Sequence, residues 1–196
     1  WSRRKPRAAE EGPLAMLDDE TLRDGLQSPS VLDPPIEAKI KILHLMDQLG
    51  VETADVGLPG SGPRQRESVE LLCREISSAG LKVEANCAAR TLEADIRPIA
   101  EVTQATGVPI EACVFIGSSP IRQYAEEWEF DFVRRLSEDA VRFAVGEGLK
   151  VMYVTEDTVR ARPEHLKILF ETAVDAGASR LCLCDTVGSA TPRGVT

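Results

Sequence analysis

The 196-residue sequence has no apolar run that approaches the roughly 20 residues needed to cross a bilayer. It also lacks an excess of positive charge: 23 Lys and Arg residues stand against 32 Asp and Glu residues, a formal net charge of −9. This balance argues against nucleic acid or an anionic membrane as the main partner. The basic N-terminus has no apolar segment behind it, so it is not a secretory signal, and we expect residues 1–13 to form a flexible arm.

The five cysteines lack the spacings of a disulfide framework or a zinc motif, and their number is odd. Most lie in apolar runs, where a free thiol behaves as a small hydrophobe. We therefore expect a reducing, cytoplasmic setting. Cys182 and Cys184 are interpreted as two residues on one face of a strand, and a metal-binding pair is the alternative.

Low-complexity segments are absent too, and short apolar runs alternate with segments of helical periodicity. Several of the helical segments are followed by a glycine, as expected past the end of a helix, and the one near Pro163 begins with a proline. A further helix is expected to open at Pro192. The predicted strands are 14–17, 53–56, 82–87, 110–116, 150–154 and 180–184.

The strands follow one another at intervals of about 30 to 40 residues, the size of one βα unit. Nearly continuous apolar strands are typical of a parallel sheet buried on both faces. We predict an α/β fold, a (β/α)8 TIM barrel that needs about 250 residues when complete. Residues 14–196 would form an incomplete catalytic barrel that covers about strands 1 to 6. A doubly wound open sheet is the competing architecture, but no Gly-x-Gly-x-x-Gly turn follows the first strand.

Polar residues follow every predicted strand. Active sites of parallel α/β folds form at the carboxyl ends of the strands. Charged groups are costly to bury there unless they are paired or bind a ligand. The pattern therefore predicts one site built from successive strand ends. The residues concerned include Arg23, Asp24, Asp55, Asn86, Arg90, Ser119, Glu156, Asp185 and Thr186.

Three of these side chains suggest a chemistry. Asp24 offers a hard oxygen ligand for a divalent cation. The planar, permanently charged Arg23 beside it can hold a carboxylate or stabilise an enolate oxygen. Glu156 can act as an acid or base, or position one. For any single carboxylate the alternative is a solvated loop residue, whereas the adjacent Arg–Asp pair favours a functional site.

Four motifs carry a family resemblance. Residues 19–27 (DETLRDGLQ), 56–59 (VGLP) and 185–192 (DTVGSATP), with Glu156-Asp157 and Arg160, occur in the right order and spacing. Together they resemble the metal-dependent TIM-barrel acyltransferases and lyases, a family that includes isopropylmalate, homocitrate and citramalate synthases and HMG-CoA lyase. The resemblance extends from about residue 14 to the end.

The resemblance implies a Claisen-type condensation of acetyl-CoA with an α-keto acid on Mg²⁺, Mn²⁺ or Zn²⁺. Asp24 would bind the metal, while Arg23 and Glu156 would be catalytic. A homodimer is also implied. The residues expected to bind substrate are Gln27, Asp55, Arg90, Ser119 and Thr186.

Some features depart from the family pattern. The family's metal site also uses a His-x-His pair on strand seven, and His44 and His165 do not replace it because both lie in predicted helices. Synthases often carry Glu at the position of Asp55 and Ser at the position of Val154. Leu26 matches the lyases, whereas synthases more often have Glu there.

Residues 21–22 and the motif at residues 185–192 are more typical of the synthases, so we favour the synthase branch of the family. The alternatives are a lyase that cleaves a 3-hydroxyacyl-CoA and a non-catalytic barrel remnant that binds a ligand. As an isolated 196-residue fragment the chain is expected to be inactive, with two exposed sheet edges that invite aggregation.

Overall fold

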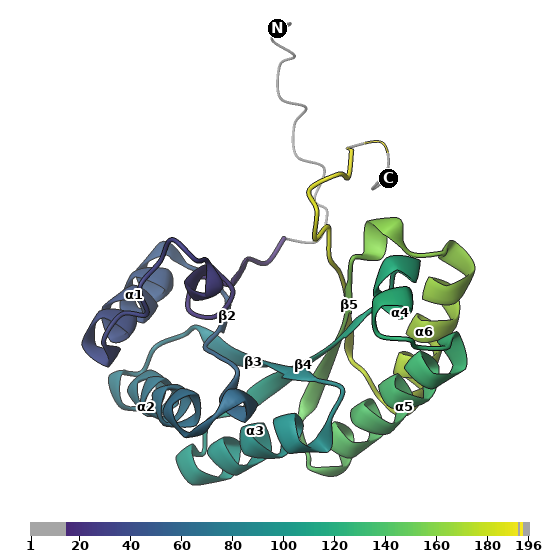
Figure 1. Ribbon diagram of the computed structural model, residues 1–196. Helices are drawn as coiled ribbons and strands as arrows, with labels where there is room; N and C mark the ends of the chain where they lie inside the picture. The colour runs from purple at the N-terminus through teal and green to yellow at the C-terminus, as the bar shows by residue number, and fades with distance from the viewer. Residues whose placement is uncertain (1–14, 192, 194–196) are drawn as a thin grey trace, which may run out of the picture.

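The computed structural model describes residues 15–191 and 193. Six parallel strands form one curved sheet in the described part of the chain, and the helices cover its convex side (Figure 1). The strands are β1 (Asp18–Asp19), β2 (Thr53–Asp55), β3 (Glu84–Arg90), β4 (Ile110–Gly117), β5 (Lys150–Glu156) and β6 (Arg180–Leu183).

The helices lie between successive strands, so the chain repeats a βα unit. They are α1 (Ile36–Leu49), α2 (Pro63–Ala79), α3 (Glu93–Thr106), α4 (Pro120–Ala125), α5 (Phe130–Gly146) and α6 (Pro163–Ala176). Three short 3₁₀ helices, η1 (Gly25–Gln27), η2 (Pro59–Ser61) and η3 (Thr158–Arg160), follow β1, β2 and β5. None of the helices described here is long and apolar enough to cross a membrane.

The order of the strands in the sheet decides between the two predicted architectures. Hydrogen-bonded neighbours follow the order of the sequence from β1 to β6. A doubly wound sheet reverses its order at a switch point, whereas a TIM barrel adds each strand beside the previous one. The fold is therefore a TIM barrel, represented here by strands 1 to 6. The predicted arm at residues 1–13 and the helix start at Pro192 lie outside the described residues.

Two predicted strand starts need correction, while the strand ends differ from the predicted ones by one to three residues. The run 14–17 was predicted as the first strand, but the paired residues are Asp18 and Asp19. Of that run, Met16 and Leu17 are 60% and 62% exposed, and Leu14 lies outside the described residues. The third strand begins at Glu84, not Lys82, because the Lys82 and Val83 amides donate to the Asp47 carboxylate.

The predicted helix ends agree with the structure. Helices α1, α2 and α6 end at Gly50, Gly80 and Gly177, all with positive φ. A left-handed residue here lets its N–H bond back to a carbonyl of the last turn, which glycine permits at little steric cost. The hydrophobic pattern of the sequence does not delimit α3 and α4 individually.

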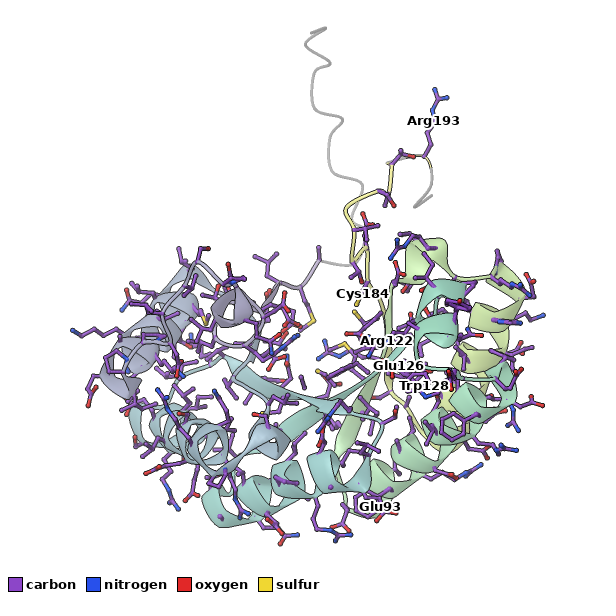
Figure 2. The ribbon with its side chains drawn as sticks, in the orientation of Figure 1. Glu93, Arg122, Glu126, Trp128, Cys184 and Arg193 are labelled. Carbon is purple, nitrogen blue, oxygen red and sulfur yellow. The ribbon has the colours of Figure 1, made fainter. Side chains whose placement is uncertain are left out.

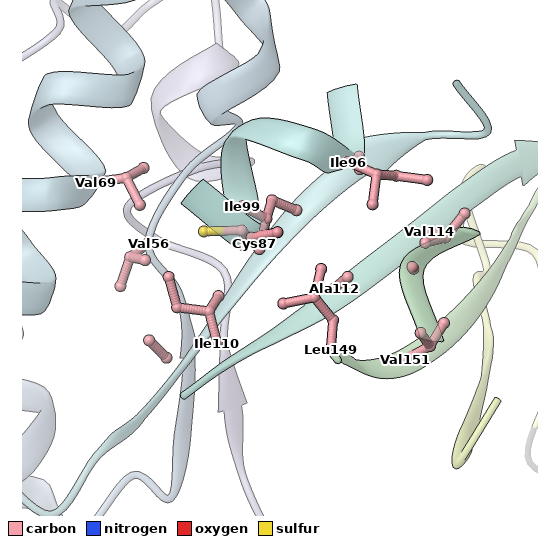
Figure 3. Packing of buried hydrophobic residues seen from close by; sticks show 14 of the residues in the cluster. Val56, Val69, Cys87, Ile96, Ile99, Ile110, Ala112, Val114, Leu149 and Val151 are labelled. Carbon is pink, nitrogen blue, oxygen red and sulfur yellow. The ribbon is translucent and has the colours of Figure 1, made fainter. Parts of the chain in front are cut away.

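The two faces of the sheet differ in chemistry because side chains alternate along each strand. The face toward the helices carries Ala54, Cys87, Val114 and Tyr153, all members of the hydrophobic core. Core side chains from β3 and β4 interdigitate there with α3 (Figure 3). The concave face instead carries polar groups; the row Asp55, Asn86, Glu111 and Lys150 crosses β2 to β5.

Gly57 occupies a position after β2 that fits no side chain. Its φ is +148°, and a Cβ added there would lie 2.8 Å from Cγ2 of Val69. Val69 is a fully buried residue of α2, so it has little room to move. The absence of a side chain at Gly57 lets β2 approach α2 and aims the chain into η2.

We expect Gly57→Ala to lower the free energy of unfolding of the full-length protein by about 2 kcal/mol through overpacking and backbone strain. Gly146→Ala is the control, since a Cβ at this helical position meets nothing within 4 Å. Urea denaturation measures both variants. Equal stability of the two would contradict the close packing described for Gly57.

Candidate active site

The predicted site residues lie where the parallel strands end. Asp55, Arg90 and Glu156 are the last residues of β2, β3 and β5. Arg23 and Asp24 follow β1, Ser119 follows β4, and Thr186 follows β6. Because all the strands run in one direction, these residues share the carboxyl-terminal edge of the sheet.

Arg23 is the centre of an ion-pair group. Its Nε donates to Oδ2 of Asp55 at 2.8 Å, and its Nη1 to Oδ1 of Asp24 at 3.1 Å. Its Nη2 donates to Glu20. Asp55 is fully buried, whereas the Asp24 side chain is 68% exposed. Arg23 thus links the ends of β1 and β2 and holds the Asp24 carboxylate at the surface of the mouth.

The carboxylates of this group outnumber its cation. Burial raises the pKa of Asp55 to about 7, with Glu20 adding to the rise and Arg23 opposing it. Burial likewise raises the pKa of Glu20, opposed by Arg23 and reinforced by Asp18 and Asp24. One guanidinium shared among three carboxylates leaves an excess of negative charge, which a proton or another cation would relieve.

A polar layer lies on the concave face beneath the mouth. Oδ1 of Asp18 accepts from Thr53 Oγ1 and from Asn86 Nδ2, each at 2.7 Å. Asn86 is fully buried, and its Oδ1 has no hydrogen-bond partner among the described residues. Oδ1 of Asp55 accepts from the Gly57 amide at 3.0 Å, which fixes the buried carboxylate.

A second group joins the ends of β4, β5 and β6. The backbone carbonyl of Glu156 accepts from Ser118 N at 3.0 Å and Ser118 Oγ at 2.8 Å. The next residue, Asp157, has a φ of 58°, and its amide donates to Thr186 Oγ1 at 2.8 Å. Ser119 is buried, caps α4 through Arg122 N and also hydrogen-bonds Asp157.

Asp157 lies at the centre of this second group and forms an ion pair with Arg160. Both of its oxygens accept from Arg160, each at 2.7 Å. The hydrogen bonds from Arg160 hold the pKa of Asp157 below its ordinary value. The carboxylate of Glu156 remains at the strand end, half-buried. Asp157 thereby connects Ser119 and Thr186, both expected to bind substrate.

Two of the predicted residues stand apart from both groups. Arg90 donates through Nε and Nη2 to Asp95 of α3, at 2.6 and 2.8 Å, although 56% of its side chain is exposed. Gln27 ends η1 with its side chain exposed. The structure places both at the same edge without a direct contact to Arg23 or Glu156.

A divalent cation fits the charge of this mouth but lacks a complete set of ligands. Asp24 supplies an exposed carboxylate in a region of excess negative charge. Among residues 15–191 and 193, no three or more His, Cys, Asp or Glu side chains are grouped so that they could hold a metal ion. The described residues therefore do not by themselves form a metal centre.

Several contributors were not singled out from the sequence. Asp18 contacts Thr53 in β2, and Glu20 follows β1 and contacts Arg23; the predicted first strand, residues 14–17, includes neither of them. Asp95 carries no local signal for its pairing with Arg90, since the contact depends on how α3 packs. Asp157 belongs to one of the family motifs, but the motif gives no sign of its left-handed backbone conformation.

The raised pKa of Asp55 predicts a pH dependence of stability. A carboxyl group with a raised pKa binds its proton more tightly in the folded state, so folding loses stability as pH rises from about 4 to about 7. Asp55→Asn removes this titration. Between these two pH values we expect the free energy of unfolding of the wild type to fall, relative to that of the variant, by on the order of 1 kcal/mol or more. Denaturant midpoints measured at several pH values test this.

Asp175→Asn, at an exposed carboxylate of α6, is the control and should parallel the wild type. Parallel curves for Asp55→Asn and the wild type would show that Asp55 is ionised in both states across this range.

The comparisons with known proteins fit this geometry. The sequence matches the HMGL-like family over residues 15–196. It is 34% identical over 176 residues to homocitrate synthase AksA of Methanopyrus kandleri, covering 89% of this chain and 42% of that protein. Identity to 2-isopropylmalate synthase of Nitratidesulfovibrio vulgaris is 33% over 184 residues, 93% of this chain and 34% of that protein.

The chain therefore spans about a third to two-fifths of the length of these relatives. Among solved structures, HMG-CoA lyase from Brucella melitensis superposes with a TM-score of 0.63 at 16% identity, over 92% of this chain and 65% of the other. At that identity the likeness concerns the fold alone. From the match over residues 15–196 and the identity to these synthases, we conclude that the chain belongs to the HMGL-like family.

Proposed function

We propose that the full-length protein is an acyltransferase of the 2-isopropylmalate and homocitrate synthase kind. It would condense acetyl-CoA with an α-keto acid and release CoA. Membership of the HMGL-like family supports this, as do the names of its synthase relatives. The single observation that carries it is the 2.8 Å hydrogen bond from Arg23 to buried Asp55, with Asp24 beside them.

The reaction places two demands on the protein. The acetyl methyl group must lose a proton, and the oxygen of the resulting enolate must be stabilised while the carbon attacks the keto carbon. Arg23, held in place on one side by Asp55, would stabilise that developing negative charge. Glu156 would serve as the acid or base, or position it. Hydrolysis of the thioester then releases CoA.

The remaining side chains would hold the substrates. Thr186 and Ser119 are connected through Asp157 and would contact the keto acid together. Gln27 is exposed in η1, after β1, and would contact it from there. Arg90 would bind a carboxylate through Nη1, because Asp95 takes its Nε and Nη2. Asp55 is fully buried, so it would act on the substrate through Arg23.

Mg²⁺, Mn²⁺ or Zn²⁺ would act as a Lewis acid on the keto group, with Asp24 as one of its ligands. The other ligands would come from outside the described residues. Asp24 suits this role because its carboxylate is exposed and Arg23 fixes its direction.

The activity is tested by CoA release from acetyl-CoA. We expect the purified full-length protein to release CoA with at least one of pyruvate, 2-oxoglutarate and 3-methyl-2-oxobutanoate when a divalent metal is present. Arg23→Lys should lower kcat/KM by about 100-fold or more, because lysine lacks the planar fork that contacts Asp55 and Asp24 together. Arg142→Lys, on the exposed surface of α5, is the control.

The alternatives give different products. Acetyl-CoA formed from a 3-hydroxyacyl-CoA, with no CoA release from any keto acid, would replace the synthase assignment with a lyase. If the metal-loaded protein catalyses neither reaction, the result would support the alternative of a non-catalytic barrel remnant that binds a ligand.

Metal binding is a separate expectation. Asp24→Asn should weaken binding of Mn²⁺ to the full-length protein by about 100-fold or more, since losing a direct ligand costs at least as much as losing a supporting contact. Isothermal titration measures the affinity, and Asp131→Asn, an exposed carboxylate of α5, is the matched control. Equal affinity of Asp24→Asn and the wild type would exclude Asp24 as a ligand.

A further inference from the structure

Two cysteines at the end of β6 form a close pair. Cys182 and Cys184 are alternate residues on the concave face, and their Sγ atoms are 3.9 Å apart. Both are half-buried, whereas the other three cysteines, Cys73, Cys87 and Cys113, are buried. The pair is therefore the one place in the described chain where two thiols are adjacent and open to a small reagent.

The pair adjoins the candidate active site. The Cys184 amide donates to Thr158 Oγ1 at 3.0 Å and to the Thr155 carbonyl at 3.2 Å, which fixes the end of β6 against β5. Thr186 follows two residues later. Figure 2 shows Cys184 beside the concave side of the sheet, where the chain leaves β6.

The two thiols differ in the direction of their pKa shifts. A hydrogen bond from Cys184 lowers the pKa of Cys182 to about 7, against burial and the nearby Glu20 and Asp18, and Arg180 assists the lowering. The same hydrogen bond, with burial and the charge of Glu156, raises the pKa of Cys184. Cys182 is thus the group that ionises first, and the thiolate is the reactive form of cysteine.

We propose that Cys182 and Cys184 form a redox-active dithiol, a modification site for low-molecular-weight disulfides at the mouth of the barrel. The 3.9 Å separation, the shared strand face and the half-exposed position carry this inference. Buried thiols are inert by comparison, as we expect of Cys73, Cys87 and Cys113.

The chemistry is two successive thiol–disulfide exchanges. The Cys182 thiolate attacks one sulfur of R–S–S–R, forming a mixed disulfide and releasing the first RS⁻. The Cys184 thiol gives its proton to solvent, and its sulfur attacks Sγ of Cys182 and expels the second RS⁻. The protein loses two electrons and two protons, and the external disulfide is reduced to two thiols.

We expect closing the bond to strain the end of β6, because alternate residues of an extended strand lie about 6.6 Å apart, near the upper limit of the Cα separation in disulfides. The two Sγ atoms must approach from 3.9 Å to the S–S bond length of about 2.05 Å. A strained disulfide is easily reduced again, which is typical of labile rather than structural disulfides. The movement acts on the segment that carries Thr186, whose Oγ1 accepts from the Asp157 amide at 2.8 Å. Oxidation would therefore disturb the second group of site residues; this consequence rests on the proposed function.

The test treats full-length wild-type protein with oxidised glutathione under native conditions. We expect the peptide that contains both Cys182 and Cys184 to lose the mass of two hydrogens and to resist alkylation until a reductant is added. Cys73, Cys87 and Cys113 serve as internal controls and should stay reduced. Failure of the pair to lose two hydrogens, or a mixed disulfide that persists on the wild type, would overturn the proposal.

Single substitutions separate the two steps. Cys184→Ser should stop at a stable glutathione adduct on Cys182, because the resolving thiol is absent. Cys182→Ser should react more slowly, and equal rates for the two variants would overturn the assigned order of attack. If either variant fails to fold, the wild-type mass measurement still decides whether the disulfide forms.

Activity gives an independent readout. Oxidation should lower CoA release by about 100-fold, the effect of moving a substrate contact by about 1 Å, and dithiothreitol should restore it. An oxidised protein with unchanged CoA release would overturn the link to the site. Reduced protein that releases no CoA would instead refute the proposed function, while the mass measurement still judges the dithiol.

Discussion

The ion pair between Arg23 and Asp55 is the contact on which the arrangement of the mouth depends. It joins the turn after β1 to the last residue of β2 across a 2.8 Å hydrogen bond. A fully buried carboxylate is costly to leave unpaired, so Asp55 requires the guanidinium, and the guanidinium is held with one edge toward Asp24. The same contact therefore satisfies a buried charge and orients the group proposed to stabilise the enolate.

The ion-pair group around Arg23 contains more carboxylates than cations. Glu20, Asp24 and Asp55 share a single arginine, and burial raises the pKa of Asp55 to about 7. Such a group tolerates, and is stabilised by, a further positive charge. In the proposed function, Arg23 and a cation near Asp24 would provide local positive charge for an anionic substrate within a negative surface.

The parallel sheet brings distant motifs to one edge without direct contact between them. Arg23 and Asp55 belong to the first two strands, whereas Glu156, Asp157 and Thr186 belong to the fifth and sixth. Each group is held together by hydrogen bonds, of Asp55 in one and of Asp157 in the other. A substrate that bridges the concave face would contact both, and the Cys182–Cys184 pair lies beside the second group. Redox chemistry there would act on the segment that carries Thr186, a member of the second group.

The sequence by itself determined the βα repeat, the helix ends at Gly50 and Gly177 and the family, because periodicity, glycine conformation and short motifs are local properties. It could not supply the strand order, which excludes the doubly wound sheet, since pairing is a long-range property. Only the tertiary structure decided that Asp55 is buried against Arg23 and that Asp95 accepts from two side-chain donors of Arg90. The first contact joins residues 32 apart in the sequence, and the second depends on how α3 packs after β3, so no short sequence pattern encodes either.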